Sequence, residues 1–403
     1  MLPFLLLLFE LGFQWKINLV GELSYSEIFL LISSFYYIPK VNPAKNRTMQ
    51  IIFIIFALLI LVQVITENII GNQVSNAMKG IAINMMAFLH INFLYYYFRK
   101  DPGLIKWLGL GIFLRNALWG AEITEDLDFA DDETALAVFA KFRLFPMLEG
   151  LIIFLSFYIN RKLFSVLTIF TGFIMILIGA RSGGGMIAIA GIITYFIGSK
   201  KEVHIKHFGF YIVATLLGIY GLYCIYANQV LKGNIDAGNN TQLLKVENPY
   251  NPVNLLMWGR SEAFVGFMAF MDNPWTGWGA WAEDPDNYYH YIQLELHDED
   301  YRKIDHTELI PGHSVLITSG LWNGVFAFIL MCTLFFIVLK RGFFLLQYAS
   351  KYYLIITYLL ISFLWNMLFS PSSHLRLTLP LPIAFILVNW EIKHKEIKLK
   401  QKS

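Results

Sequence analysis

Charged residues are scarce in this sequence. Of its 403 residues only 15% are Asp, Glu, Lys or Arg, whereas 57% are hydrophobic and the mean hydropathy is +0.54. A soluble globular domain carries about one quarter charged residues. The deficit argues against an ordinary soluble domain and predicts a protein with several membrane-spanning helices. The net charge of +2 says little by itself, and we expect no nucleic-acid partner.

Cysteine is almost absent, and internal repeats, Pro-rich linkers and low-complexity tracts are missing. Cys224 and Cys332 each lie within an apolar run, so we expect small apolar residues there, not a disulfide framework or a metal site. The start, MLPFLLLLFELGF, lacks the basic region and the small-residue cleavage site of a signal peptide. We therefore expect a first helix that is retained.

Long apolar runs are abundant. We count twelve, at residues 2–13, 22–38, 49–66, 78–98, 103–120, 142–160, 163–180, 182–198, 206–228, 313–339, 352–369 and 375–391. A bilayer core needs about 20 residues, and several runs are shorter, so their ends are approximate. The pattern predicts an all-α polytopic membrane protein with about twelve transmembrane helices.

Lysine and arginine follow every even-numbered apolar run. They are Lys40, Lys45, Arg47, Arg99, Lys100, Arg161, Lys162, Lys200, Lys201, Lys206, Lys340 and Arg341. Cytoplasmic loops carry such an excess, so we expect both termini in the cytoplasm. The predicted organisation is a set of transmembrane helices over 1–228, an extracytoplasmic subdomain over 229–312, further transmembrane helices over 313–391 and a basic cytoplasmic tail over 392–403.

Four arginines break this pattern because they lie at the opposite, outer ends of the runs. They are Arg115, Arg143, Arg181 and Arg376, and Arg260 lies in the insert on the same side. A charge at mid-membrane depth costs about 2.5–3.5 kcal/mol. Snorkelling to lipid headgroups explains any one of them. For the set we favour a shared anionic ligand, since the planar guanidinium binds phosphate bidentately.

Residues 257–281, MWGRSEAFVGFMAFMDNPWTGWGAW, predict a short amphipathic helix from Arg260 to Met271 and then a glycine turn. The simplest interpretation is a helix lying on the membrane with Trp and Phe at the interface. That interpretation leaves Arg260 unexplained. A helix start is electropositive, so a cation is poorly placed there unless an anion joins it.

Residues 311–330, PGHSVLITSGLWNGVFAFIL, begin the tenth run with His313. One interpretation of His313 is a helix-start residue bonded to backbone. The other is a general base at the membrane surface, because an ordinary histidine pKa near 6.5 suits proton abstraction at neutral pH. Gly320 and Gly324 are four apart, which on one helical face permits close packing of another helix.

The end of the insert is acidic. It holds Glu295, His297, Asp298, Glu299, Asp300, Asp305, His306 and Glu308. Their spacing matches no metal motif, so we favour a solvated acidic face and assign neither a metal nor a cofactor.

Three stretches in this order resemble the O-antigen ligase and polymerase family of bacterial membrane glycosyltransferases. They are GARSGGGMIAIAG, GRSEAFVGFMAFMDNPWTGWG and GHSVLITSGLWNG. The last is similar to that family's motif of histidine, a small polar residue and a later glycine, here His313, Ser314 and Gly324. The likeness covers residues 170–330 well and the first 140 residues in hydropathy only.

The resemblance implies a GT-C-like fold in the bacterial inner membrane and a glycan on undecaprenyl pyrophosphate as donor. It implies inverting transfer without a metal. Arg181 and Arg260 would bind the pyrophosphate, Ser314 would contact substrate with the other outer arginines, and His313 would deprotonate the acceptor. A chain-length regulator protein is left open as a partner.

Several activities remain open. A polymerase extends another lipid-linked repeat unit, and a ligase transfers the chain to lipid A–core. We favour a polymerase, since the chain has Ala327 where ligase-type motifs more often have Gly, Thr or Tyr. A transporter lacks support from inverted repeats. A structural scaffold would not need His313.

Overall fold

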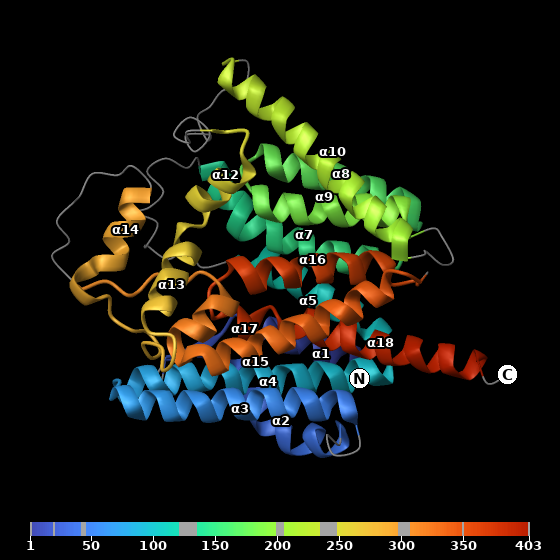
Figure 1. Ribbon diagram of the computed structural model, residues 1–403. Helices are drawn as coiled ribbons and strands as arrows, with labels where there is room; N and C mark the ends of the chain where they lie inside the picture. Colours follow the sequence, from blue (N-terminus) through green and yellow to red (C-terminus); the bar gives the residue numbers. More distant parts are fainter. Residues whose placement is uncertain are drawn as a thin grey trace.

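The computed structural model describes residues 2–18, 21–41, 46–120, 135–198, 205–233, 248–296, 307–348 and 350–401. In this part of the chain the fold is a bundle of long helices that run roughly side by side (Figure 1). The exception is a small antiparallel hairpin of β1 (Lys16–Asn18) and β2 (Glu22–Ser24). The predicted all-α class is confirmed, and the hairpin is an addition to it.

Each predicted apolar run coincides with a helix. These are α1 (Leu2–Leu11), α2 (Tyr25–Val41), α3 (Arg47–Ile70), α4 (Val74–Lys100), α5 (Ile105–Leu118), α7 (Phe145–Leu155), α8 (Arg161–Leu177), α9 (Arg181–Phe196), α10 (Ile205–Leu231), α15 (Val315–Leu345), α16 (Tyr353–Phe369) and α18 (Pro380–Lys400). Among the described residues, α3, α4 and α15 are long and apolar enough to cross a membrane. Twelve crossings remain a prediction.

Short helices occupy the connections. A 3-10 turn (Pro102–Leu104) precedes α5, and α6 (Ala135–Phe139) with a π-helical turn (Ala140–Leu144) precedes α7. The insert contains α12 (Pro252–Gly259), α13 (Ser261–Asp272), a 3-10 turn (Pro285–Asn287) and α14 (Tyr288–Leu296). A four-residue helix, α17 (His374–Leu377), separates α16 from α18. The predicted insert thus carries short helices.

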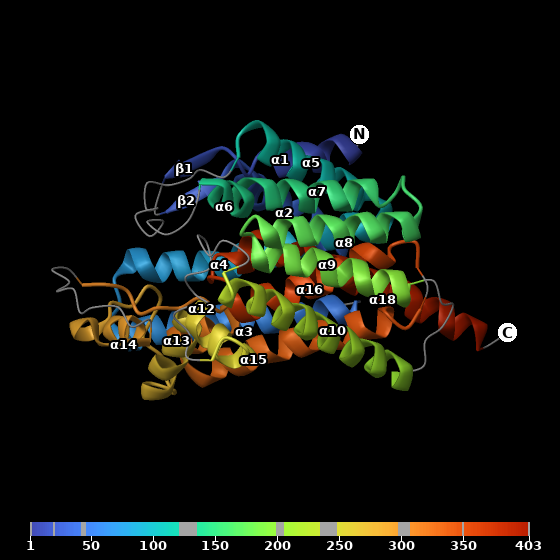
Figure 2. The same cartoon turned by 90° about the horizontal axis from the view of Figure 1, so that it is seen from above.

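The two termini lie at one end of the bundle, and α12, α13 and α14 lie at the other end (Figures 1 and 2). The core between the ends is apolar. The second half of α4 is almost entirely buried. As a whole, α4 packs against α2, α3 and α18. That the basic loops lie on the cytoplasmic side of a membrane stays a prediction.

Glycines let α8 and α9 pack closely in an antiparallel pair. The Cα of Gly184 lies so near α8 that a Cβ there would sit 2.6 Å from the carbonyl oxygen of Gly172. Gly183 lies in the same way against the ring of Phe145, whereas a Cβ on Gly185 would meet nothing within 4 Å. Gly183 and Gly184 thus serve helix packing, in the manner typical of small residues in membrane helices.

Helix α15 is broken at Gly324, where φ is 73° and ψ is −172°. The segment 274–279 fills the break and satisfies the backbone groups that the broken helix frees. Three hydrogen bonds join the two: from Trp278 N to Leu321 O (2.7 Å), from Gly279 N to Trp322 O (3.0 Å) and from Val325 N to Pro274 O (2.7 Å). The prediction that Gly320 and Gly324 share the face of one continuous helix is wrong. Gly320 does pack closely, against the ring of Phe270.

Candidate active site at the end of the bundle opposite the termini

His313 is exposed and directly precedes the N-cap of α15. That cap is Ser314, whose buried hydroxyl accepts a hydrogen bond from the N–H of Ile317 at 3.2 Å. The same hydroxyl donates to the carbonyl of Met367, near the end of α16, at 3.3 Å. Ser314 therefore holds the start of α15 against the end of α16, and this contact fixes the backbone next to His313.

A second histidine, His374 of α17, lies beside His313. Burial, with a smaller electrostatic contribution from His313, lowers the pKa of His374 to about 4. Its Nδ1 lies 2.9 Å from the hydroxyl oxygen of Thr378. At neutral pH His374 is therefore an uncharged imidazole next to His313. Our sequence reasoning missed it, although it stands two residues before the arginine singled out in SPSSHLRLTL.

Arg260 joins the same region from the insert. It occupies the junction of α12 and α13, half-buried, with its guanidinium 5.2 Å from the centre of the Trp365 ring. Burial lowers the pKa of Arg260, and the carboxylate of Glu262 opposes the shift. An arginine stays charged at pH 7. The guanidinium of Arg260 thus lies over α16, within one helical turn of Met367. The carbonyl of Met367 accepts the hydrogen bond from Ser314 at the start of α15.

Arg181 is the first residue of α9 and is half-buried. Helix α9 packs against α16, and its start and α12 lie at the same end of the bundle in both views (Figures 1 and 2). The segment that carries Arg143 lies near the start of α9, because Ala140 and Ala180 belong to the same apolar cluster. Its Nη2 donates to the carbonyl of Ala117 at 3.1 Å.

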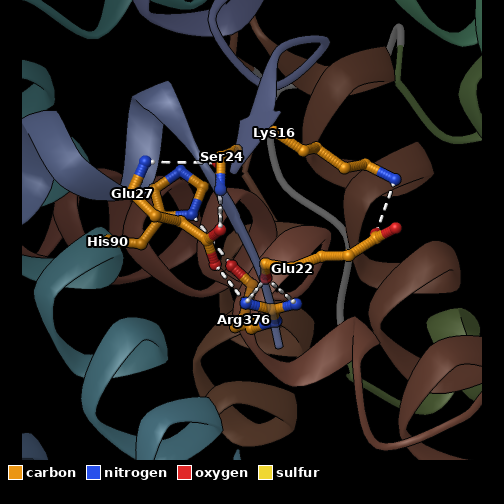
Figure 3. Close-up of polar contacts among 6 residues, drawn as sticks. All are labelled: Lys16, Glu22, Ser24, Glu27, His90 and Arg376. Carbon is orange, nitrogen blue, oxygen red and sulfur yellow. Dashed lines mark hydrogen bonds and ion pairs between the residues drawn. The ribbon is translucent and has the colours of Figure 1, made fainter. Parts of the chain in front are cut away.

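The other two arginines meet carboxylates. Arg115 of α5 forms an ion pair with Glu10 of α1 at 2.8 Å, and the side chains are 24% and 10% exposed. Arg376 forms one with Glu27 of α2 at 2.7 Å (Figure 3). Both cations are thereby compensated within the chain. That they bind an anionic substrate stays a prediction.

The surroundings of Arg376 show how α17 is held. Its guanidinium also donates to the backbone carbonyl of Glu22 in the hairpin, and its own carbonyl lies 3.1 Å from Nδ1 of His90 in α4 (Figure 3). The hairpin, α2 and α4 therefore fix α17 from one side. His374 lies on this same short helix, so these contacts also set its position.

The described residues contain no group of three or more His, Cys, Asp or Glu arranged to hold a metal ion. Residues 297–306 of the acidic stretch lie outside the described part of the chain, and of that stretch Glu295 is exposed and Glu308 is half-buried. What the described site offers is two histidines, a half-buried cation and an aromatic face. Such a set can bind an anion and accept a proton.

No protein-family model matches the chain, and no curated protein is significantly similar to it. The likeness to the O-antigen ligase and polymerase family therefore rests on the three motifs alone. In the structure two of these motifs, 259–279 and 312–324, are in direct contact through the interlock at Gly324.

Proposed function

We propose that the protein is a membrane glycosyltransferase that polymerises a surface polysaccharide of the O-antigen type. The donor is a glycan on undecaprenyl pyrophosphate, and the acceptor is the non-reducing-end hydroxyl of another lipid-linked repeat unit. One observation carries the proposal. His313 and His374 are close enough to interact electrostatically, the residue after His313 is bonded to Met367 of α16, and Arg260 lies over Trp365 of the same helix.

In the proposed reaction the acceptor oxygen bonds to the anomeric carbon while the bond from that carbon to pyrophosphate breaks. Undecaprenyl pyrophosphate leaves with the bonding electron pair, and the hydroxyl proton moves to the imidazole of His313. Arg260 and Arg181 stabilise the charge that grows on the leaving group, and such preset donors contribute about 3–4 kcal/mol each. A positioned base adds about 10²–10⁴-fold.

His374 has a defined part in this mechanism. A second charged imidazole would oppose protonation of His313 by like-charge repulsion. Because the pKa of His374 is about 4, that repulsion is absent at neutral pH. The proposal needs neither a metal nor a nucleotide sugar.

The proposed setting is the bacterial inner membrane, with both termini in the cytoplasm and the site on the periplasmic face. This orientation follows from the basic residues at the termini end of the bundle, such as Lys100 of α4 and Lys340 of α15. Lipid-linked donor and acceptor would both reach the site from the outer leaflet.

One observation favours a transporter as a second candidate. Helices that break within the membrane often line substrate or ion sites in transporters. Helix α15 breaks at Gly324. However, the segment 274–279 donates to or accepts from the freed backbone groups, so the break is filled by the protein itself.

The first test is a lipopolysaccharide gel of the source strain with this gene deleted. Core carrying a single repeat unit supports the polymerase. Bare core, with long polymer accumulating on the lipid carrier, identifies a ligase. Unchanged lipopolysaccharide contradicts both activities, and transport by the purified protein in vesicles without glycan product identifies a transporter.

Complementation of the deletion then tests the base. His313→Ala should lower glycan transfer by about 10²–10⁴-fold while the protein still inserts, because proton abstraction is lost. His290→Ala, in α14 and on the same side of the molecule, is the matched control and should restore long chains. Long chains from His313→Ala would refute the assignment.

A further inference from the structure

Helix α13 carries an apolar stripe on its outer face. Phe264, Phe267, Met268 and Met271 recur at the spacing of one helical face, and Trp275 follows in the next segment. The exposed fractions are 45% for Phe267, 44% for Met268, 56% for Met271 and 72% for Trp275. An exposed apolar patch of this kind marks a surface that contacts another apolar phase or partner.

The stripe is not a misplaced core face, because the other side of α13 already makes the core contacts. Val265, Ala269 and Phe270 are buried in a cluster with Leu321 of α15. Gly266 lies directly against the backbone of Pro311. With one face packed on the protein, the stripe points away from it.

The end of the stripe adjoins α15. The Trp275 carbonyl lies against Gly324, which brings the end of the stripe next to the segment that resumes the helix. There Phe326 is 60% exposed and Ile329 is 54% exposed. Helix α15 is long and apolar enough to cross a membrane, and in a bilayer these two exposed side chains would face lipid.

We infer that α13 lies in the headgroup and upper acyl region of the outer leaflet, with its stripe in contact with lipid. We take the bilayer as the occupant, because the end of the stripe adjoins the segment of α15 that exposes Phe326 and Ile329. Glu262 at one end of α13 and Asp272 at the other are polar, as befits a helix lying along an interface. Arg260, at the start of α13, then lies at the depth of lipid phosphates.

The inference does not depend on glycosyl transfer and would hold equally for a transporter. It concerns how deeply the insert sits, whereas the proposed function concerns what the site does. Immersion of α13 accounts for a site that is open to a lipid-linked anion arriving within the leaflet.

The test uses the full chain with Cys224→Ser and Cys332→Ala. Single cysteines at Met268 or Met271 are labelled with an environment-sensitive fluorophore. The protein is reconstituted in phosphatidylcholine vesicles whose acyl chains are brominated either near the headgroup or near the methyl end. Two positions serve as references: Phe336, 62% exposed on α15, for lipid, and Glu295, exposed on α14, for water.

We expect loss of fluorescence at positions 268 and 271 with bromine near the headgroup, and a smaller loss with bromine near the methyl end. Position 336 should be quenched and position 295 should not. Unquenched emission at 268 and 271 overturns the inference. If the unquenched emission is also blue-shifted and changes with the protein-to-lipid ratio, the stripe is covered by a second copy of the protein and the inference is overturned as well.

Discussion

At the scale of single residues, the arginines on the insert side of the bundle divide by what they meet. Arg376 and Arg115 face the carboxylates of Glu27 and Glu10, whereas Arg260 faces an aromatic ring. An ion pair satisfies a half-buried cation within the protein, and a ring leaves its hydrogen-bond donors available. Of these three, Arg260 is the one without an ion pair, which supports its proposed contact with an anionic ligand.

Removing Arg376 tests the structural role of its ion pair. The side chain of Glu27 is only 3% exposed, and it also accepts from the backbone N–H and hydroxyl of Ser24. Arg376→Met leaves this buried carboxylate without its counter-charge, which costs about 3–5 kcal/mol. Thermal unfolding of the purified protein in lipid nanodiscs should show a lower midpoint.

Two controls accompany that variant. The double variant Glu27→Gln with Arg376→Met should recover most of the loss, because no uncompensated charge remains. Lys16→Met breaks the neighbouring exposed pair with Glu22, at 2.7 Å, and should change stability by about 0–1 kcal/mol. Equal midpoints for Arg376→Met and Lys16→Met would show that the buried pair contributes nothing.

At the scale of elements, the interlock of α15 with segment 274–279 joins two motifs that the sequence presents separately. The sequence predicted a glycine turn and a helix, and both are present. Their contact was not predictable, because it requires a break at Gly324 and the approach of a distant backbone. A left-handed φ at Gly324 makes glycine the residue that fits there.

Gly324→Ala tests the interlock. A Cβ at this position would overlap the carbonyl oxygen of Trp275, and a φ of 73° is strained for alanine. Backbone strain of this kind costs about 1–3 kcal/mol. We expect a lower unfolding midpoint together with reduced glycan transfer, since the segments carrying Arg260 and His313 would shift apart.

Gly185→Ala is the matched control for Gly324→Ala. Gly185 is helical, and a Cβ there would meet nothing within 4 Å, so stability and transfer should be unchanged. A Gly324→Ala protein as stable and active as Gly185→Ala would mean that the break tolerates a side chain and that the interlock is not under strain.

At the scale of the whole molecule, the ends of the bundle carry the functional asymmetry. The termini lie at one end, and the insert helices α12, α13 and α14 lie at the other (Figure 1). Between the ends, buried ion pairs such as Glu10 with Arg115 compensate charge within the described part of the bundle. In the proposed reaction, the orientation in the membrane decides which compartment supplies the acceptor.

Cysteine accessibility tests that orientation. In the background without native cysteines, a cysteine at Glu295 should react with a membrane-impermeant maleimide in spheroplasts, and one at Gln401 should not. Inverted membrane vesicles should reverse the result. Labelling of both positions from one side would contradict the predicted topology. Both residues are exposed, so protein burial does not confound the comparison.

The sequence by itself determined the helical class, the approximate extent of each long helix, the polar insert and the basic character of one set of loops. These properties depend on local hydropathy and charge, which each segment carries on its own. It also singled out His313 and Arg260. Only the tertiary structure decided that Glu27 compensates Arg376, that His374 lies beside His313, and that segment 274–279 fills the break in α15. Ion pairs and backbone hydrogen bonds between distant residues arise from packing geometry, and packing geometry is a property of the assembled chain.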